Sequence, residues 1–329
     1  NRARKEGLEL TVKDIFTHQT PDALSKNLKH TGNLPDKIIP SSGIKTIQDT
    51  SPLMNEFLSL GGDQNSFNQA AVFIAPEGLS AESAIEQLNK LIRINPALRM
   101  KITRDGVVVE TPDICTLSTL PVIETDTQNL LEALQDFGAD LNPEEAGGSF
   151  CACWVNLGDG VQALALVVHH YAVDAASWSI LLSQLNNLHS GQINPEPVSA
   201  FDWNCRVKEM AFAGEFTDQI PFWKNQIALK TEPKERVVYY EKNAEHHDFS
   251  IEITEETLYR LSELKITLQE YLLCCLGNAL SRWRAKNGVK KSLTIDLEGH
   301  GRPIEAGLEN VVGWLTSLFP FKVSTRQSI

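Results

Sequence analysis

The chain has 329 residues, of which 42% are hydrophobic and 22% are charged, and this balance excludes a disordered or fibrous protein. At roughly 150 residues per domain, the length predicts about two domains or one double-lobed unit. The formal net charge of −12 argues against a general electrostatic attraction to nucleic acid or to an anionic membrane, and we expect neither as a partner.

The N-terminal residues are polar, and no stretch of about 18 apolar residues occurs in the chain, which predicts neither a signal peptide nor a membrane span. Residues 10–18 predict a short element, and a turn at 19–21 precedes a helix that begins at Asp22. Residues 30–50 carry Pro, Gly and Ser without apolar periodicity, which indicates a linker and a domain boundary near 30–45. We interpret the chain as cytoplasmic and, because it begins without Met, as a piece of a longer protein.

A strand followed by an amphipathic helix is predicted at 67–75 and 81–100, from β-branched residues in the first segment and an apolar stripe in the second. Residues 102–110 predict a hairpin with Asp-Gly in its turn. Residues 151–170 predict two strands, and the second is apolar on both faces, which is typical of a central strand. A helix is expected over about 176–188.

The remainder of the chain is predicted to be largely helical. Residues 189–202 are rich in Pro and Gly and indicate a hinge between two lobes. The expected elements after it are helices at 203–213, 216–228, 255–264 and 267–286, a strand at 292–299 and an apolar segment at 311–323. With no internal repeat, this pattern predicts a mixed α/β protein in two halves.

The six cysteines show no paired CxxC spacing and lie mostly in apolar stretches such as 271–277, so we interpret them as reduced, buried, small hydrophobic residues. The sequence contains no Gly-rich phosphate loop and no ligand cluster, and we predict no metal and no nicotinamide cofactor. His246, His247 and Asp248 lie in a charged segment that we interpret as a solvated loop. GGDQN at 61–65 is interpreted as a turn.

The segment VVHHYAVDAASW at 167–178 places two histidines at the end of an apolar strand, with an aspartate four residues later. Neighbouring side chains of a strand point to opposite faces, so His169 and His170 cannot both face one cleft if the strand continues through them. A histidine at a strand end suits general base or oxyanion-stabilising work, whereas two core histidines are the alternative for this segment taken alone. Asp174 is expected to cap the next helix or to pair with an arginine.

The segment IDLEGHGRP at 295–303 is the second candidate for chemistry. A strand runs here into Glu298, Gly299, His300, Gly301 and Arg302. The two glycines allow a tight turn and a close approach to a ligand, although an exposed turn with a solvated glutamate explains the segment taken alone. Arg302 is a natural partner for Asp174 if the two strand ends meet.

In combination, these segments resemble the condensation-domain superfamily of nonribosomal peptide synthetases, which shares its fold with chloramphenicol acetyltransferase. HHYAVDAAS is similar to the HHxxxDGxS motif, NPALRMKI at 95–102 to an early arginine-containing motif, and LQEYLLCCLGNAL at 268–280 to the DxLLxAxG helix. DLEGHGRP and VVGWLTSLFP resemble the EGHGRE and TVGWFTSLFP motifs of the epimerization branch, and condensing members generally lack that glutamate. The resemblance covers about residues 40–329.

The resemblance implies an α/β fold of two chloramphenicol acetyltransferase-like lobes in a V, with an active-site tunnel between them. Residues 3–28 resemble the last part of a peptidyl carrier domain, without its pantetheine-bearing serine motif. The implied domains are a carrier tail at 1–30, a linker at 31–45, an N-terminal lobe at 46–195 and a C-terminal lobe at 196–329. The C-terminal lobe is expected to be truncated, because later family motifs do not occur before the chain ends.

The implied activity is epimerization at the Cα of an aminoacyl or peptidyl thioester in secondary metabolite biosynthesis, which yields a D-amino acid residue. The substrate would be carried on the phosphopantetheine of a carrier domain of the same synthetase, with a downstream condensation domain as a further partner and no cofactor of the domain's own. Glu298 is expected to act as a general acid/base, buried so that it works near neutral pH, and His170 as the opposing acid/base or the stabiliser of the enolate oxygen. The residues assigned to positioning are His169, Asp174, Ser177 as the opening of the helix, Gly299, Gly301 and Arg302.

The chain departs from the family pattern at three places, and two rival functions stay open. Ala175 stands where the family usually has Gly, a change expected to narrow the tunnel or bend the helix entry, and Pro303 replaces the usual Glu. Residues 51–58 match the family's opening motif poorly. The rivals are a condensation domain, which would use His170 without needing Glu298, and a degenerate domain that only docks carrier domains.

Overall fold

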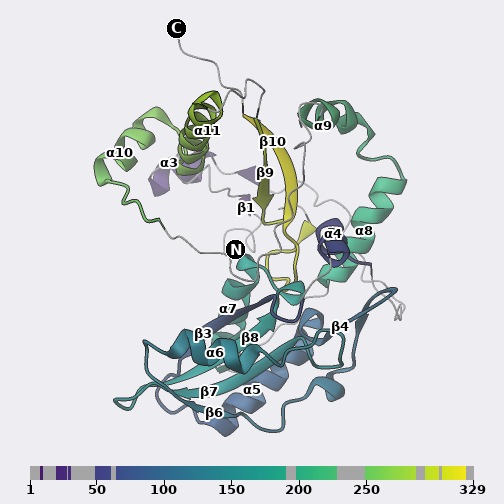
Figure 1. Cartoon of the computed structure of the whole chain (residues 1–329), viewed down its shortest axis with the longest axis vertical. Coiled ribbons are helices and arrows are strands. Elements are labelled where there is room, and N and C mark those ends of the chain that lie inside the picture. The colour runs from purple at the N-terminus through teal and green to yellow at the C-terminus, as the bar shows by residue number, and fades with distance from the viewer. Residues whose placement is uncertain are drawn as a thin grey trace. The chain divides into compact units, whose positions relative to one another are not determined.

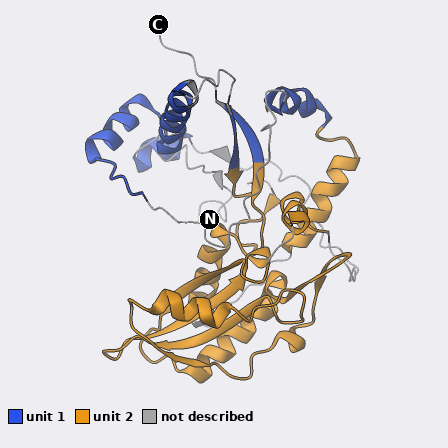
Figure 2. Ribbon diagram, viewed as in Figure 1, with its two compact units in different colours: residues 1–33, 217–297, 319–329 blue, residues 34–216, 298–318 orange. Residues whose placement is uncertain are grey.

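The computed structural model describes nine stretches of the chain (Figure 1), namely residues 8–9, 20–27, 29–30, 49–60, 64–189, 198–227, 249–286, 293–303 and 306–323. The chain divides into two compact units (Figure 2). Unit 1 comprises Asn1–Asn33, Thr217–Leu297 and Phe319–Ile329, and unit 2 comprises Leu34–Phe216 and Glu298–Leu318. The expected element at 10–18, most of the linker at 30–50, most of the hinge at 189–202 and the loop with His246 and His247 lie outside the described residues.

Unit 2 is built on a four-stranded sheet with the order β3-β8-β7-β6. Its strands are β3 (Asn68–Ile74), β6 (Val122–Glu124), β7 (Phe150–Asn156) and β8 (Gln162–His169). β8 pairs antiparallel with both β3 and β7, and β6 pairs parallel with β7. Every residue of β8 after Gln162 is buried, which confirms the prediction that this doubly apolar strand is central.

Helices cover both faces of this sheet (Figure 1). Leu164, Leu166 and Val168 of β8 pack in one cluster with residues of α5 (Ala81–Ile94) and α7 (Ala175–His189). The intervening Ala163 and Ala165 pack in a second cluster with α6 (Leu130–Gly138). This alternation follows from the two-residue period of a strand, and it places α5 and α7 on one face and α6 on the other.

The other elements of unit 2 support this core. The predicted hairpin is present as β4 (Met100–Thr103) and β5 (Gly106–Val109), and Gly106 has a φ of 139°. Three further elements were not predicted from the sequence: α4 (Pro52–Leu60), α6 and the short strand β6. The helix α8 (Ala200–Phe212) begins at a capping box of Ser199 with Asp202.

Unit 1 contains the predicted helices α9 (Ile220–Ile227), α10 (Glu255–Leu264) and α11 (Leu268–Lys286). It also contains α3 (Pro21–Asn27) and the short pair β1 (Leu8–Glu9) and β2 (Lys29–His30). β9 (Leu293–Gly299) pairs with β10 (Ser317–Val323), and the division between the units falls within both strands.

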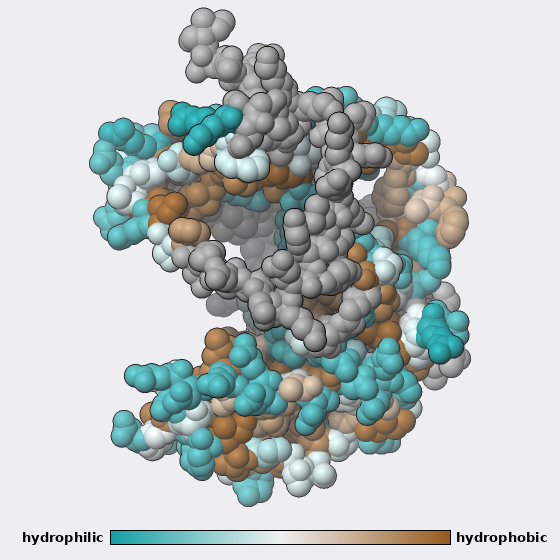
Figure 3. Space-filling view, viewed as in Figure 1, coloured by the Kyte–Doolittle hydropathy of each residue, from teal (hydrophilic) through white to brown (hydrophobic). Residues whose placement is uncertain are grey.

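Large apolar side chains of α10 and α11 are exposed, and brown surface is visible in this region (Figure 3). The same exposure corrects one expectation about the cysteines. Cys274 and Cys275 on α11 are exposed rather than buried, because no described element covers that part of the helix, although all six cysteines are free as expected. No helix among the described residues is long and apolar enough to cross a membrane.

Candidate active site

His169 is the last residue of β8, and its side chain is completely buried. Its Nδ1 accepts a hydrogen bond of 3.3 Å from the backbone N–H of Tyr171, and its Nε2 lies 2.7 Å from the carbonyl oxygen of Gln64. Because Nδ1 accepts, the proton sits on Nε2, which donates to Gln64. Burial lowers the pKa of His169 to about 4. His169 is therefore a neutral residue that fixes the backbone at the end of the strand.

His170 lies just beyond the strand, at the start of a 3-10 turn that covers His170–Ala172. Its ring stacks on Phe67 with centroids 4.5 Å apart and an interplanar angle of 4°, and the Trp314 ring lies 4.9 Å away. The side chain is partly exposed, but its Nδ1 is buried and has no hydrogen-bond partner among the described residues. The two histidines are thus placed differently because the strand ends between them.

Asp174 caps the helix that follows. Its Oδ1 accepts the backbone N–H of Ser177 at 2.9 Å and lies 2.8 Å from the Ser177 hydroxyl. The helix begins at Ala175. This corrects the expectation for Ser177, which lies in the first turn rather than opening the helix, because the helix begins at Ala175 and Asp174 already caps the backbone N–H of Ser177.

Arg302 joins the two candidate segments. Its guanidinium donates to both carboxylate oxygens of Asp174, at 2.7 and 2.9 Å, and both side chains are buried. It also donates to the carbonyl oxygens of His300, Val311 and Gly313. The pairing of Asp174 with Arg302 expected from the sequence is therefore present, and it ties the segment after β9 to the start of α7.

The glycines around His300 differ in what they do. Gly301 has a φ of 61°, and a Cβ at this position would lie 1.5 Å from the carbonyl oxygen of Leu315. Gly301 is therefore required both by its left-handed backbone and by close approach to another backbone segment. Gly299 is the last residue of β9 and is not among the residues with a positive φ.

Glu298 lies near the end of β9, within unit 2, and its side chain is exposed. This corrects the expectation that protein atoms bury it, because the strand end on which it lies is not covered by other described elements. His300, two residues on, is also exposed, and its Nδ1 accepts the backbone N–H of Arg302 at 3.0 Å.

The role of Gln64 was not predicted from the sequence. Besides accepting from His169, it accepts the Tyr171 hydroxyl at 2.8 Å through Oε1 and donates to the carbonyl oxygen of Phe57 in α4. Burial raises the pKa of Tyr171 to about 12, so this hydroxyl stays protonated and donates. The residues around Gln64 predict only a turn, and no local pattern indicates a partner 105 positions away.

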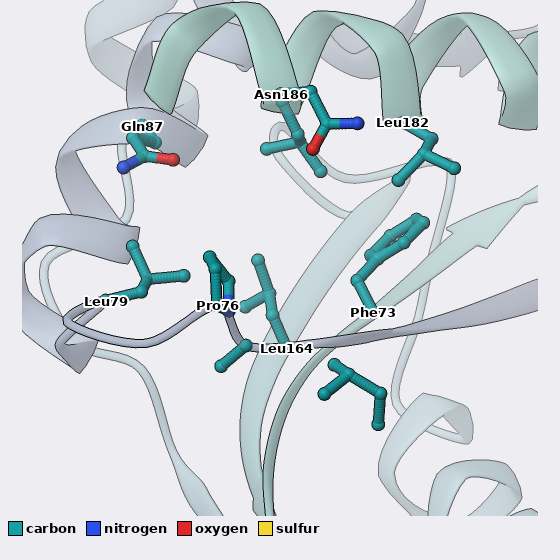
Figure 4. Close-up of a pocket in the computed structure, with 10 residues that line it drawn as sticks. Phe73, Pro76, Leu79, Gln87, Leu164, Leu182 and Asn186 are labelled. Carbon is teal, nitrogen blue, oxygen red and sulfur yellow. The ribbon is translucent and has the colours of Figure 1, made fainter. Parts of the chain in front are cut away.

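The apolar cavity in Figure 4, of about 90 Å³, is not part of this site. It lies among β3, β8, α5 and α7, and Phe73, Leu79, Leu164 and Leu182 are among its lining residues. None of the candidate residues lines it. Among the described residues, no group of three or more His, Cys, Asp or Glu side chains could hold a metal ion.

Comparison with known proteins gives matches over most of the chain. The family model of the condensation domain matches residues 54–329. The chain is 27% identical to bacitracin synthase 3 of Bacillus licheniformis over 99% of its length and 25% identical to tyrocidine synthase 1 of Brevibacillus parabrevis over 98%. It spans only 5% and 31%, respectively, of those two proteins.

Two kinds of solved domain share the fold. The epimerization domain from the third module of tyrocidine synthetase B matches with a TM-score of 0.61 and 20% identity, over 85% of this chain and 69% of that one. The condensation domain from Monacolin K polyketide synthase matches with a TM-score of 0.65 and 13% identity, over 85% of this chain and 68% of that one. The α/β fold predicted from the sequence is confirmed, and fold similarity does not separate the two activities.

Proposed function

Because this chain belongs to the condensation-domain family, we propose that it epimerizes the Cα of an aminoacyl or peptidyl thioester within a nonribosomal peptide synthetase. Domains of this family use no cofactor of their own, and their substrates are carried on the phosphopantetheine of a partner carrier domain. Epimerization is the finer assignment, and it depends on Glu298.

The observation that carries this proposal is the buried pair of Arg302 with Asp174. Glu298 lies four residues before Arg302, and His170 lies four residues before Asp174. The ion pair therefore links the two candidate segments within unit 2. A carboxylate and an imidazole held in one unit are the kind of groups that proton transfer at a carbon requires.

The chemistry follows from the thioester. Its carbonyl group acidifies the adjacent Cα–H, and inversion requires that this proton leave one face of the carbon and return to the other. We assign Glu298 as general acid/base and His170 as the opposing acid/base or as the donor that stabilises the enolate oxygen. Since Glu298 is exposed, we propose that the bound substrate arm covers it during the reaction.

Condensation is the second candidate, because His170 alone serves it and a solved condensation domain shares the fold. A domain that only docks carriers is the third, since Ala175 and Pro303 depart from the family pattern. Ala175 gives this reading little support, because it is the exposed first residue of an uninterrupted helix.

The deciding experiment is deuterium uptake at Cα of an aminoacyl-phosphopantetheine-loaded carrier domain in D₂O, followed by mass spectrometry. Loss of the Glu298 acid/base group in Glu298→Gln should slow deuterium uptake by roughly 10²–10⁴-fold. Uptake should also slow strongly in His170→Ala. Glu263→Gln, an exposed carboxyl on α10, is the matched control and should exchange normally.

Full uptake and epimerization by Glu298→Gln would exclude the mechanism. Amide formation from two loaded carriers, without Cα exchange, would establish condensation instead. Carrier binding with neither reaction would establish the docking function.

A further inference from the structure

The ring of His170 is held by two aromatic side chains. Phe67 stacks parallel to it at 4.5 Å, and Trp314 packs against it at 4.9 Å with a tilt of 56°. Phe67 and Trp314 also contact each other, with centroids 5.8 Å apart. We call Phe67 and Trp314 the aromatic clamp.

The Trp314 side of the clamp is fixed by the buried polar network. The backbone N–H of Gly313 donates to the Ser177 hydroxyl at 3.1 Å, and that of Leu315 donates to Oδ2 of Asp174, also at 3.1 Å. Both neighbours of Trp314 are therefore bonded to the start of α7. Trp314 itself is 6% exposed, so its ring has little freedom to leave His170.

The Phe67 side is fixed by backbone and by a second ring. The carbonyl oxygen of Phe67 accepts the backbone N–H of His170 at 2.9 Å. Its ring stacks on Phe57 of α4 with centroids 4.1 Å apart. The clamp therefore holds the His170 ring from two independently anchored segments.

The clamp leaves the two nitrogens of His170 in different surroundings. Nδ1 is buried without a hydrogen-bond partner among the described residues, whereas the side chain as a whole is partly exposed. Nε2 is therefore the nitrogen that a substrate can reach. A proton on Nδ1 would be a buried donor with no acceptor, which is costly, and costlier still on a cationic ring. Stacking on Phe67 attracts a cation weakly but provides no acceptor for that N–H.

We propose that Phe67 and Trp314 are positioning residues that hold His170 as the neutral tautomer with its proton on Nε2. This inference rests on the proposed epimerization and assigns His170 within it as a hydrogen-bond donor. The proton that leaves Cα moves to the Glu298 carboxylate, and the electron pair moves to the thioester oxygen, where Nε2–H of His170 donates. The planar enolate then turns so that its opposite face meets the same carboxyl group, which returns the proton there and completes the inversion.

The test is nitrogen NMR of the whole chain labelled with ¹⁵N-histidine, near neutral pH, with the His170 signals assigned by their loss in His170→Gln. We expect a protonated Nε2 and an unprotonated Nδ1. Trp314→Phe, which keeps an aromatic ring, should preserve this pattern, and Trp314→Leu should shift it toward an average of both tautomers. Trp283→Leu, at an exposed position on α11, is the matched control and should leave it unchanged.

Phe67→Leu is a second variant that removes one ring of the clamp, and its position is partly exposed. It allows the same test if the larger cavity in Trp314→Leu prevents folding. It should also mix the tautomers, and it should lower kcat for Cα exchange roughly 10-fold with KM unchanged, because only transition-state stabilisation is lost. A cationic ring, or a proton on Nδ1, in the unsubstituted chain would overturn the inference even if epimerization occurs. If His170 shows the expected tautomer but no Cα exchange occurs, the positioning role of the clamp is supported and the proposed epimerization is excluded.

Discussion

Arg302 and Asp174 lie 128 positions apart in the sequence and form a bidentate ion pair with distances of 2.7 and 2.9 Å. The pair is buried, and both partners make further hydrogen bonds to backbone groups of residues 311–315. Buried charges are tolerated only when they are paired and hydrogen-bonded in this way. The ion pair is therefore the connection that brings the segment with Glu298 and Trp314 to the segment with His170.

Replacement of Arg302 by Met should destabilise unit 2 strongly. Asp174 would be left as a buried carboxylate without a cation, which costs about 3–5 kcal/mol of unfolding free energy. Arg302→Lys should recover only part of the loss, because an ammonium group cannot reproduce the planar fork. Urea unfolding measures both effects.

Arg206→Met is the matched control for that measurement. Arg206 contacts Glu209 and Glu215 at 3.9 and 3.6 Å, and all three side chains are at least 43% exposed. Such exposed pairs contribute about 0–1 kcal/mol. If Arg302→Met were no more destabilising than Arg206→Met, the ion pair would not hold the two segments together.

Gly301→Ala should be more destabilising than Gly307→Ala. Both glycines have a positive φ, 61° and 68°, so each alanine introduces a backbone strain of about 1–2 kcal/mol. At Gly301 the new Cβ would also meet the Leu315 carbonyl oxygen, whereas at Gly307 it would meet nothing within 4 Å. We expect an additional cost of about 1–3 kcal/mol for Gly301→Ala, measured by urea unfolding. Equal costs would show that Leu315 moves away freely.

The strands and helices with strong periodicity could be predicted from the sequence. β8 is apolar on both faces and is central, and α11 was predicted within one residue of its observed start. The pairing of Asp174 with Arg302 was also predictable. Each residue carries a charge opposite to that of the other, and each lies just beyond the end of a predicted strand. The strand and the helix follow from local composition, and the ion pair follows from two motifs that each supply one of its charged side chains.

The aromatic clamp and the role of Gln64 could not be predicted. Phe67 and Trp314 lie in segments far apart in the sequence, and only the folded backbone brings both to His170. Burial of Glu298 was expected from its proposed chemistry rather than from its neighbours, and the side chain is exposed. The predicted domain boundaries, the tunnel and the catalytic roles stay predictions.

Ala175→Gly, which restores the residue usual in the family, should change activity little. Ala175 is the first residue of α7, is exposed and has no positive φ. Its methyl group therefore neither strains the helix start nor fills buried space. We expect a loss of at most about 1 kcal/mol in stability and less than roughly a twofold change in kcat/KM for Cα exchange. A large gain in kcat/KM would show that the methyl group obstructs the substrate.

His169 should make the stability of the chain depend on pH below neutrality. Its pKa is about 4 in the folded chain because of burial, against 6.5 for the unperturbed side chain. Between these values the unfolded chain binds more protons than the folded chain, so the free energy of unfolding falls as the pH falls. The contribution of neutral His169 to the free energy of unfolding is fully present above about pH 6.5 and is lost by about pH 4. Its full size is about 3 kcal/mol.

The His169→Gln variant isolates this contribution. A glutamine amide can donate to the Gln64 carbonyl oxygen, as Nε2 of His169 does, but it does not titrate. Carboxylates that titrate in the same range are common to both proteins and cancel in the difference. We therefore expect the stability advantage of the unsubstituted chain, measured by urea unfolding at several pH values, to shrink steadily from pH 6.5 to about pH 4. A difference independent of pH would mean that His169 is protonated in the folded chain or becomes exposed to water.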